Sequence, residues 1–411
     1  MGMNSSDSSR THDVMIWGAT GYTGRLVALA ASRHLTEHRW AIAGRSRERL
    51  EAIRNEISEA GGHPPEIVVA SLDDPASMRA MTGATRVVLS TVGPYDLVGE
   101  ALIEACIATG THVCDITGEV PWVRRMRSRH ELAAREADIR VVSMCGYDSV
   151  PSELGVRLLQ EAAIARIGRP AREIEMAVGP IRGGVSGGTI ASALNMITQA
   201  SDPEVRRGLR GPMALCVSPP SEVKVTSGEQ WGIRRSRILD MWTGPFFMAG
   251  VNVAVVHRTN ELLGRPWGDD FRYRECAAGG RGITGFLHSM LLALGTVGLA
   301  VVLLVPPLRW MARRWFLPSP GHGPDEARLQ AGYMRHQTAS ADPPVSVNFA
   351  VDMDPGYAAT ARMLLACGQS LIEEDIDQTV PDAFCTPGAL FGNRIVPRLE
   401  AMSFRIDVRT G

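Results

Sequence analysis

The stretch Gly18-Ala19-Thr20-Gly21-Tyr22-Thr23-Gly24 decides the fold of this chain. It follows the short apolar run 13–17 and precedes the helix-forming run 25–31, so the pattern predicts a strand, a glycine turn and a helix. Glycines let the backbone turn sharply, and the free N–H groups at the start of the next helix attract a pyrophosphate. The spacing is GxxGxxG rather than GxGxxG, but it stands directly after the first strand. We therefore expect nucleotide binding at this turn.

Strand and helix patterns alternate along the first 150 residues. Further strands are expected at 40–43, 67–70, 86–91, 111–115 and 140–144, and helices at 47–57, 99–109 and 123–137. This order predicts an α/β fold with a Rossmann-type doubly wound parallel sheet. Such a sheet binds its ligand at the carboxyl ends of its strands.

The residues after the second expected strand indicate which dinucleotide binds. An NAD-binding fold usually has an acidic residue there for the ribose hydroxyls, whereas this chain has Gly44-Arg45-Ser46-Arg47. A guanidinium pairs with a 2′-phosphate, which a carboxylate would repel, so the sequence favours NADP(H) over NAD(H). The alternative is that these arginines only begin a solvated helix. Asp73, after the third strand, lies on the same ligand-binding side of the sheet.

The composition excludes several classes of protein. The chain has 411 residues, of which 45% are apolar and 21% charged, so a folded protein of two or three domains is expected. The net charge of −1 argues against nucleic-acid binding. The only lysine is Lys224, which leaves one candidate for lysine chemistry, outside every motif.

The cysteines and the N-terminus bear on the compartment. Seven scattered cysteines form no CxxC pair and no zinc-like spacing, so we expect reduced core thiols and no metal site. Residues 1–12 read as a polar leader without the apolar core of a signal peptide. An intracellular protein is therefore expected.

At this point the chain resembles a known family, the saccharopine dehydrogenase-like oxidoreductases, and within it the subgroup of mycobacterial trans-acting enoyl reductases. The matching motifs are Gly18–Gly24, Ala43-Gly-Arg-Ser46, Ser90-Thr-Val-Gly-Pro-Tyr95, Asp115-Ile-Thr-Gly-Glu119, Gly146-Tyr-Asp-Ser-Val-Pro-Ser152, Gly183-Gly-Val-Ser-Gly-Gly-Thr189 and Asp354-Pro-Gly-Tyr357. The resemblance implies a nicotinamide-dependent reductase or dehydrogenase. It also implies that the glycine turn lies on the pyrophosphate and that loop 90–95 lies beside the nicotinamide ribose.

These arguments give a set of candidate site residues. The expected cofactor-binding residues are Gly18, Thr20, Gly21, Tyr22, Thr23, Gly24, Arg45, Ser46, Arg47, Asp73, Thr91, Val92, Gly93 and Pro94. Tyr95 and Tyr147 are candidate proton donors, with Asp148 as an orienting partner.

The second half is expected to form an α+β domain over 151–411 for substrate binding and possible homodimerisation, after a nucleotide-binding domain over 13–150. It is interrupted at 283–318 by a hydrophobic segment. Residues 283–305 carry no formal charge and are long enough to cross a bilayer core of about 30 Å. Arginines and tryptophans follow in 309–315, which is typical of a membrane interface. The alternative is a helix buried on all faces.

The order of the segments restricts the kind of membrane contact. The resemblance implies that residues 345–352 and 354–357 complete the same domain as 151–282, so both flanks of the apolar segment must lie on one side of a membrane. The pair Pro306-Pro307 can bend the chain back. We therefore expect a monotopic insertion into a bilayer or a lipid-droplet surface. Residues 319–344 look like a surface connection, and 402–408 like an edge strand.

The sequence thus predicts an NADPH-dependent oxidoreductase that acts on a lipid or another apolar substrate at a membrane or lipid-droplet surface. Hydride would go to an activated double bond or carbonyl. Two alternatives stay open: a soluble amino-acid-type dehydrogenase, and a non-catalytic membrane scaffold that senses a nucleotide.

Overall fold

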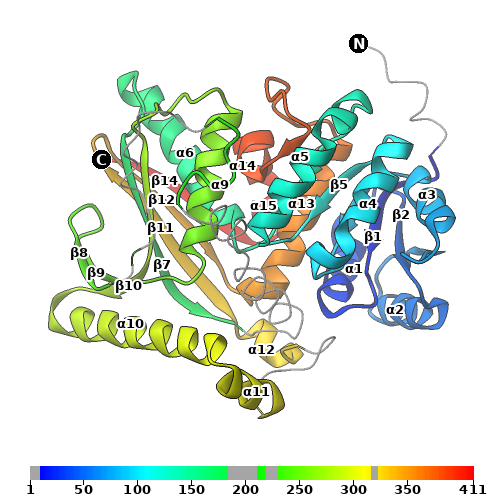
Figure 1. The fold of residues 1–411 in the computed structure, drawn as a ribbon, viewed down its shortest axis with the longest axis horizontal. Coiled ribbons are helices and arrows are strands. Elements are labelled where there is room, and N and C mark those ends of the chain that lie inside the picture. Colours follow the sequence, from blue (N-terminus) through cyan, green and yellow to red (C-terminus); the bar gives the residue numbers. More distant parts are fainter. Residues whose placement is uncertain (1–9, 184–210, 219–229, 231, 316–322) are drawn as a thin grey trace. The chain divides into compact units, whose positions relative to one another are not determined.

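The computed structural model describes residues 10–183, 211–218, 230, 232–315 and 323–411 (Figure 1). The chain divides into two compact units. The first holds the residues up to Tyr147 and Gly356–Met402, and the second holds most of 148–355 with Ser403–Gly411. This division falls beside the boundary expected near 150, whereas Gly356–Met402, expected in the second domain, lies in the first unit.

The first unit contains a seven-stranded parallel sheet in the order β13-β6-β5-β4-β1-β2-β3. Its strands are β1 (His12–Trp17), β2 (Trp40–Gly44), β3 (Glu66–Val69), β4 (Thr85–Ser90), β5 (His112–Asp115), β6 (Val141–Val142) and β13 (Phe384–Cys385). The connecting helices are α1 (Tyr22–His34), α2 (Arg47–Glu59), α3 (Pro75–Gly83), α4 (Tyr95–Thr109) and α5 (Val120–Glu136). The doubly wound prediction is confirmed. The strand order reverses between β1 and β4, which is where such sheets bind ligands.

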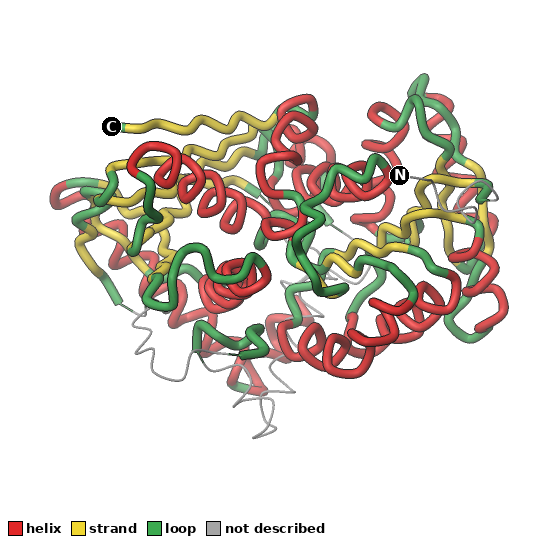
Figure 2. Tube along the Cα trace, turned by 90° about the horizontal axis from the view of Figure 1, so that it is seen from above, coloured by secondary structure: helices red, strands yellow, loops and turns green. Residues whose placement is uncertain are grey.

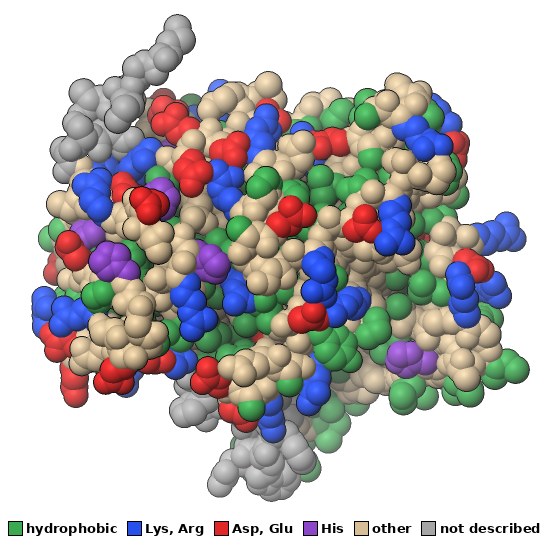
Figure 3. Space-filling model, turned by 180° about the vertical axis from the view of Figure 1, so that it is seen from behind, with side chains coloured by type: hydrophobic (Ala, Val, Ile, Leu, Met, Phe, Trp, Pro, Cys, Tyr) green, Lys and Arg blue, Asp and Glu red, His purple; other side chains and the backbone are tan. Residues whose placement is uncertain are grey.

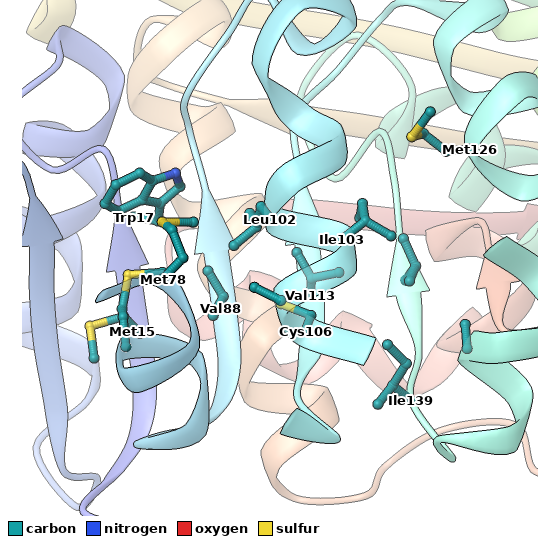
Figure 4. Close-up of a cluster of buried hydrophobic side chains, with 14 of the residues drawn as sticks. Met15, Trp17, Met78, Val88, Leu102, Ile103, Cys106, Val113, Met126 and Ile139 are labelled. Atoms are coloured by element: carbon teal, nitrogen blue, oxygen red, sulfur yellow. The ribbon is translucent and has the colours of Figure 1, made fainter. Parts of the chain in front are cut away.

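The core of this unit packs against the sheet and is shown in Figure 4. Met15 and Val88, from β1 and β4, are fully buried, and Cys106 of α4 lies among them. All seven cysteines are buried free thiols, as the sequence predicted. Burial raises the pKa of the Cys106 thiol, which makes it a poor nucleophile.

The chain returns to the first unit through η2 (Pro355–Ala359) and α13 (Thr360–Ile372), and ends there with β13, α14 (Pro387–Leu390), η3 (Gly392–Ile395) and α15 (Val396–Ala401). Helix α13 packs against α1 and β4, and a Cβ at Gly368 would lie 2.7 Å from Leu89 Cδ2. Met363 and Leu364 of this helix are fully buried. The expected short helix after Thr386 is confirmed as α14, with Thr386 as its N-cap.

The second unit contains a seven-stranded mixed sheet in the order β14-β12-β11-β7-β10-β9-β8. Its strands are β7 (Glu173–Arg182), β8 (Arg234–Ser236), β9 (Met241–Gly244), β10 (Arg272–Gly280), β11 (Tyr333–Ala341), β12 (Pro344–Val351) and β14 (Phe404–Thr410). Helices α6 (Val150–Ile167) and α9 (Ala249–Leu262) pack on it, and Val156, Ile174 and Phe271 are core residues. Figure 2 shows β14 along the outer edge, which confirms the expected edge strand.

The structure differs from one expectation for this unit, and another expectation concerns residues that the structure does not describe. Residues 319–344 are expected to be a surface connection, but their described part contains α12 (Glu326–Gln330) and β11, an inner strand of the sheet. Several buried positions of β11 hold polar residues, His336, Thr338 and Ser340, so the sequence shows no apolar alternation that would indicate a strand. The glycine-rich motif 183–189 lies outside the described residues beyond Gly183, as do residues 1–9 of the leader.

The apolar segment forms α10 (Gly282–Leu304), and α11 (Pro306–Trp315) begins at the proline pair. Among the described residues α10 is the one helix long and apolar enough to cross a membrane, and little of it is buried. The alternative of a helix buried on all faces is therefore not met within the described residues.

Candidate functional site

The first glycine turn has a geometry that only glycine fits. Gly18 has φ of +88°, and a Cβ there would lie 2.5 Å from Val92 Cγ2. The Gly21 N–H donates to Gly18 O at 2.9 Å and closes the turn. Gly18 therefore combines a left-handed backbone with a close approach to the loop after β4.

The third glycine lets α1 start against the turn. A Cβ at Gly24 would lie 2.2 Å from Gly18 O, so a larger residue would push the helix away. Helix α1 has no side-chain cap at Gly21 and no acidic residue in its first turn. Its leading N–H groups and its positive dipole end are thus available to an anion.

The loop after β4 is bound to the glycine turn. The Thr91 N–H donates to Trp17 O at 3.0 Å, and its hydroxyl donates to the same oxygen at 3.2 Å. Thr91 and Val92 are half-buried and Gly93 is exposed. The structure therefore brings together the glycine turn with Thr91 and Val92, from the two segments that the sequence predicted as parts of one cofactor site.

The residues expected to recognise the adenosine ribose lie at the end of β2. Gly44 is next to the turn, since a Cβ there would lie 3.6 Å from Thr20 Cγ2. Arg45 is exposed and makes no ion pair with any residue that the structure describes. Arg47 is also exposed, at 3.9 Å from Glu51, whereas Ser46 caps α2 by accepting the Arg49 N–H. Of these two arginines, Arg45 is thus the one without an ion pair to any described residue.

Of two further candidate cofactor-binding residues, Asp73 is exposed, whereas the ring of Tyr22 packs against another aromatic ring. Asp73 is exposed at the end of β3, and its N–H donates to Ser71 Oγ at 3.4 Å. The Tyr22 ring packs edge-to-face on Tyr357 with centroids 5.1 Å apart. Tyr357 was expected to serve the second domain through its motif, but it belongs to the first unit.

The conformation of loop 90–95 is held by a buried carboxylate that the sequence reading did not select. Glu119 Oε1 accepts the Tyr95 N–H and Oε2 accepts the Asp96 N–H, each at 3.0 Å. Glu119 is only 2% exposed. It therefore caps α4 from a separate segment, and the anionic end of its side chain meets the positive end of that helix.

Asp115, at the end of β5, ties that same segment to β6. Its carboxylate accepts the Thr117 N–H at 2.9 Å and the Ser143 hydroxyl at 2.8 Å. Burial raises the pKa of Asp115 to about 6, against the lowering effect of these hydrogen bonds. Both acids lie in the motif 115–119, but buried capping cannot be read from residue identity alone.

The two candidate tyrosines differ in accessibility. Tyr95 is buried; its hydroxyl donates to Ser90 O at 2.9 Å and accepts the Ile116 N–H at 3.3 Å. Burial holds the pKa of Tyr95 well above its usual value of 10.0. Tyr147 is only half-buried, and its N–H donates to Thr360 Oγ1 at 3.0 Å. Asp148 is exposed and falls in the second unit. Tyr95 therefore has a fixed structural role in this state, whereas Tyr147 is more accessible.

The described residues contain one cluster of possible metal ligands, Glu100, Glu104 and His130. Glu100 already accepts Arg129 at 3.0 Å and His130 at 2.9 Å. The cluster lies on α4 and α5, and none of its three residues belongs to the motifs that suggest a cofactor.

The site as a whole fits a dinucleotide with a 2′-phosphate. The close packing at Gly18 and Gly24 holds the turn against the start of α1, whose first N–H groups have no side-chain cap, and the exposed Arg45 follows Gly44, which lies next to Thr20. Comparison with known proteins agrees. Residues 14–142 match the model of the saccharopine dehydrogenase NADP binding domain. A Mycobacterium tuberculosis protein assigned by name to the trans-acting enoyl reductases is 34% identical over 95% of this chain and 96% of its own length.

The chain belongs to the saccharopine dehydrogenase-like oxidoreductase family. A trans-acting enoyl reductase of Mycobacterium ulcerans is 31% identical over 96% of this chain and 97% of its own length. The fold of this oxidoreductase is also that of apo saccharopine dehydrogenase (L-Glu forming) from Saccharomyces cerevisiae, with a TM-score of 0.50 at 12% identity over 97% of this chain and 100% of the yeast chain. This family member is therefore an oxidoreductase that uses NADP(H).

Proposed function

We propose that this oxidoreductase uses NADPH to reduce an activated double bond or carbonyl of a lipid or other apolar substrate, at a membrane or lipid-droplet surface. The observation that carries the proposal is the similarity, along nearly the whole chain, to proteins named trans-acting enoyl reductases. Between a double bond and a carbonyl, these names favour the double bond.

The cofactor half of the proposal assigns tasks to residues of the first unit. Gly18, Gly21 and the first turn of α1 would hold the pyrophosphate, and Arg45 would pair with the 2′-phosphate. Residues 91–94 would flank the nicotinamide ribose, in a loop whose shape depends on Glu119. The bound reduced nicotinamide supplies a hydride to one carbon of the substrate.

The second carbon then needs a proton from the protein. A phenol keeps its proton at neutral pH, since its usual pKa is about 10. Tyr147 is the better of the two candidate donors because it is half-buried and therefore more accessible to a substrate than the buried Tyr95. Asp148, its neighbour in the chain, is the candidate that orients it.

The apolar substrate class is supported by α10, whose exposed face consists of large hydrophobic side chains. A protein held at a lipid surface can receive molecules that do not diffuse through water. The alternatives of an amino-acid substrate and of a non-catalytic scaffold become outcomes of the test below.

The test follows NADPH absorbance with the purified protein and four sets of substrates: long-chain enoyl thioesters, short-chain enoyl thioesters, long-chain carbonyls and amino-acid conjugates. We expect oxidation of NADPH with a long-chain enoyl or carbonyl substrate, and slower turnover with short chains. NADP⁺ reduction by amino-acid conjugates alone would contradict the substrate class. NADPH binding without turnover on any set would favour the scaffold.

A further inference from the structure

Helix α10 is attached to the second sheet along one narrow stripe. A Cβ at Gly279 would lie 1.8 Å from Ser289 Oγ, and one at Gly285 would lie 2.2 Å from Gly280 O. Gly285 and Ser289 are the buried residues at the start of this helix. Small residues on both sides therefore allow the first part of α10 to lie directly on β10.

Aromatic and further glycine contacts strengthen the attachment. The Trp242 ring of β9 meets the Phe286 ring edge-to-face, with centroids 5.1 Å apart. A Cβ at Gly244 would lie 3.1 Å from Ser289 O and 3.2 Å from Leu292 Cβ. The docked part of α10 therefore extends to about Leu292, and lipid cannot surround it.

The rest of the helix surface is apolar and uncovered. Leu287, Leu291 and Leu294 are 50%, 67% and 63% exposed. A Cβ at Gly295 or Gly298 would meet no described atom within 4 Å. Figure 3 shows hydrophobic side chains gathered at the lower right of the molecule, on the side where α10 runs. The exposed apolar surface continues to Leu304 and reaches Trp310 of α11.

The length of the undocked part decides between spanning a bilayer and lying on it. Residues 293–304 of the helix are about 18 Å long, whereas a bilayer core is about 30 Å thick. A complete span would require the part docked on β9 and β10 to leave the sheet. The docked helix is instead suited to lie in the interface with its apolar face toward the acyl chains.

The charge of this region indicates which lipids it meets. No acidic residue stands between Glu275 and Asp325, whereas Arg281, Arg309, Arg313 and Arg314 do. Arg281 is paired with Asp240 at 3.2 Å. The other three belong to α11, which follows the apolar helix directly in the chain, and arginines next to an apolar segment are typical of a membrane interface.

We propose that α10 and α11 form an in-plane anchor that binds anionic lipid surfaces, with α10 held parallel to the surface by its glycine contacts with β9 and β10. This inference rests on the membrane location in the proposed function and adds an orientation and a lipid class. One arginine near an anionic surface contributes on the order of fivefold in affinity, so three contribute on the order of a hundredfold.

The first experiment measures flotation of the full chain with vesicles of phosphatidylcholine that contain increasing amounts of phosphatidylglycerol. We expect binding that rises with the anionic lipid and weakens with salt. The triple variant Arg309→Gln, Arg313→Gln, Arg314→Gln should lose on the order of a hundredfold in affinity. Its control removes the same charge from the exposed residues Arg166, Arg169 and Arg172 and should bind as the wild type does. Vesicle binding that does not depend on the phosphatidylglycerol content would contradict the proposed anionic lipid class. A triple variant that binds vesicles as tightly as the wild type would contradict it as well.

The second experiment measures depth. Because all seven native cysteines are buried, Val297→Cys offers an exposed thiol for a fluorophore. We expect stronger quenching by lipids with a spin label near the headgroup than by lipids labelled near the chain end. Stronger quenching by the lipids labelled near the chain end would indicate that α10 spans the bilayer and would contradict the in-plane anchor.

A variant of the apolar face separates lipid binding from self-association. Leu287→Gln, Leu291→Gln and Leu294→Gln change exposed side chains, so the fold should persist while vesicle binding is lost. If the wild-type protein binds no vesicles but forms a stable dimer, and these substitutions make it monomeric, the apolar face contacts a second copy of the chain. That result would refute the anchor. NADPH turnover on a detergent-dispersed substrate is measured in parallel, so a failed anchor leaves the proposed reaction separately testable.

Discussion

Glu119 Oε1 accepts the backbone N–H of Tyr95 at 3.0 Å, and this bond fixes the end of the loop proposed to contact the nicotinamide ribose. The same carboxylate accepts the Asp96 N–H. One buried side chain from the 115–119 motif thus caps α4 and sets the shape of the 90–95 motif.

Glu119→Ala should therefore lower both stability and cofactor affinity. Loss of the cap leaves the buried Tyr95 N–H and the half-buried Asp96 N–H without their acceptor, which should cost about 1–3 kcal/mol in the free energy of unfolding. Urea unfolding and NADPH fluorescence titration measure the two effects. Glu119→Gln, which keeps one oxygen acceptor, should be milder, and Glu104→Ala on the exposed side of α4 should change little. Equal behaviour of Glu119→Ala and Glu104→Ala would contradict the capping role.

The glycine turn gives a matched pair of substitutions. Gly18→Ala forces a side chain into the left-handed region and onto Val92, so it should destabilise the protein by about 2 kcal/mol or more. Gly21 is exposed with φ of −82°, so Gly21→Ala should fold normally and weaken NADPH binding only. Thermal unfolding with and without NADPH distinguishes the two. Normal stability of Gly18→Ala would argue against the described turn.

The two tyrosines can be separated by kinetics. Tyr147→Phe should lower turnover by about 10²-fold or more while NADPH affinity stays constant, because it removes only the proposed proton donor. Tyr95→Phe should mainly reduce stability, since its hydroxyl joins Ser90 O to the Ile116 N–H. If Tyr95→Phe loses turnover and Tyr147→Phe does not, the order of the two candidates is reversed.

The buried side chain of Glu275 makes the stability of the second unit depend on pH. It is fully buried, and Asn252 Nδ2 and the Tyr273 hydroxyl each donate to it at 2.7 Å. Burial raises its pKa from 4.5 to about 7, so the folded state binds the proton more tightly than the unfolded state. Its contribution to stability is then fully present below pH 4.5 and is lost as the pH rises through about 7.

Glu275→Gln should remove that dependence. As the pH rises through this window, the free energy of unfolding of the variant should increase by up to about 3 kcal/mol relative to that of the wild type. Urea unfolding of both proteins at pH 5 and pH 8 measures the change. Parallel pH profiles for the two proteins would show that Glu275 does not titrate as described.

The sequence predicted the parts of the fold that depend on local pattern. The strand and turn at 13–24 and the alternation to 142 carry strong apolar periodicity, and the structure confirms them. The return of Gly356–Met402 to the first unit was not predictable, because β13 has two residues and α13 shows no preference for one sheet. Strand β11 was missed because its polar residues and the preceding glycines and prolines resemble a loop.

In the candidate site, too, the residues that leave a local sequence pattern were predicted, and those that act through long-range contacts were not. Gly18 and Gly24 were found because a turn of this kind leaves a glycine pattern in the sequence. Glu119 and Asp115 were missed as site residues, because a capping carboxylate acts across distant segments and has no spacing of its own. Tyr95 was selected by its place in a motif, and its burial could only come from the structure.

Titration of the protein with NADPH and NADH, followed by nucleotide fluorescence, tests the central claim most directly. Arg45→Ala is compared with Arg47→Ala, whose guanidinium lies near Glu51. We predict that NADPH binds more tightly, and that Arg45→Ala weakens it by about tenfold to a hundredfold toward the NADH value while NADH is unaffected. Equal affinities of the wild-type protein for the two nucleotides, or no effect of Arg45→Ala, would contradict recognition of the 2′-phosphate at the end of β2.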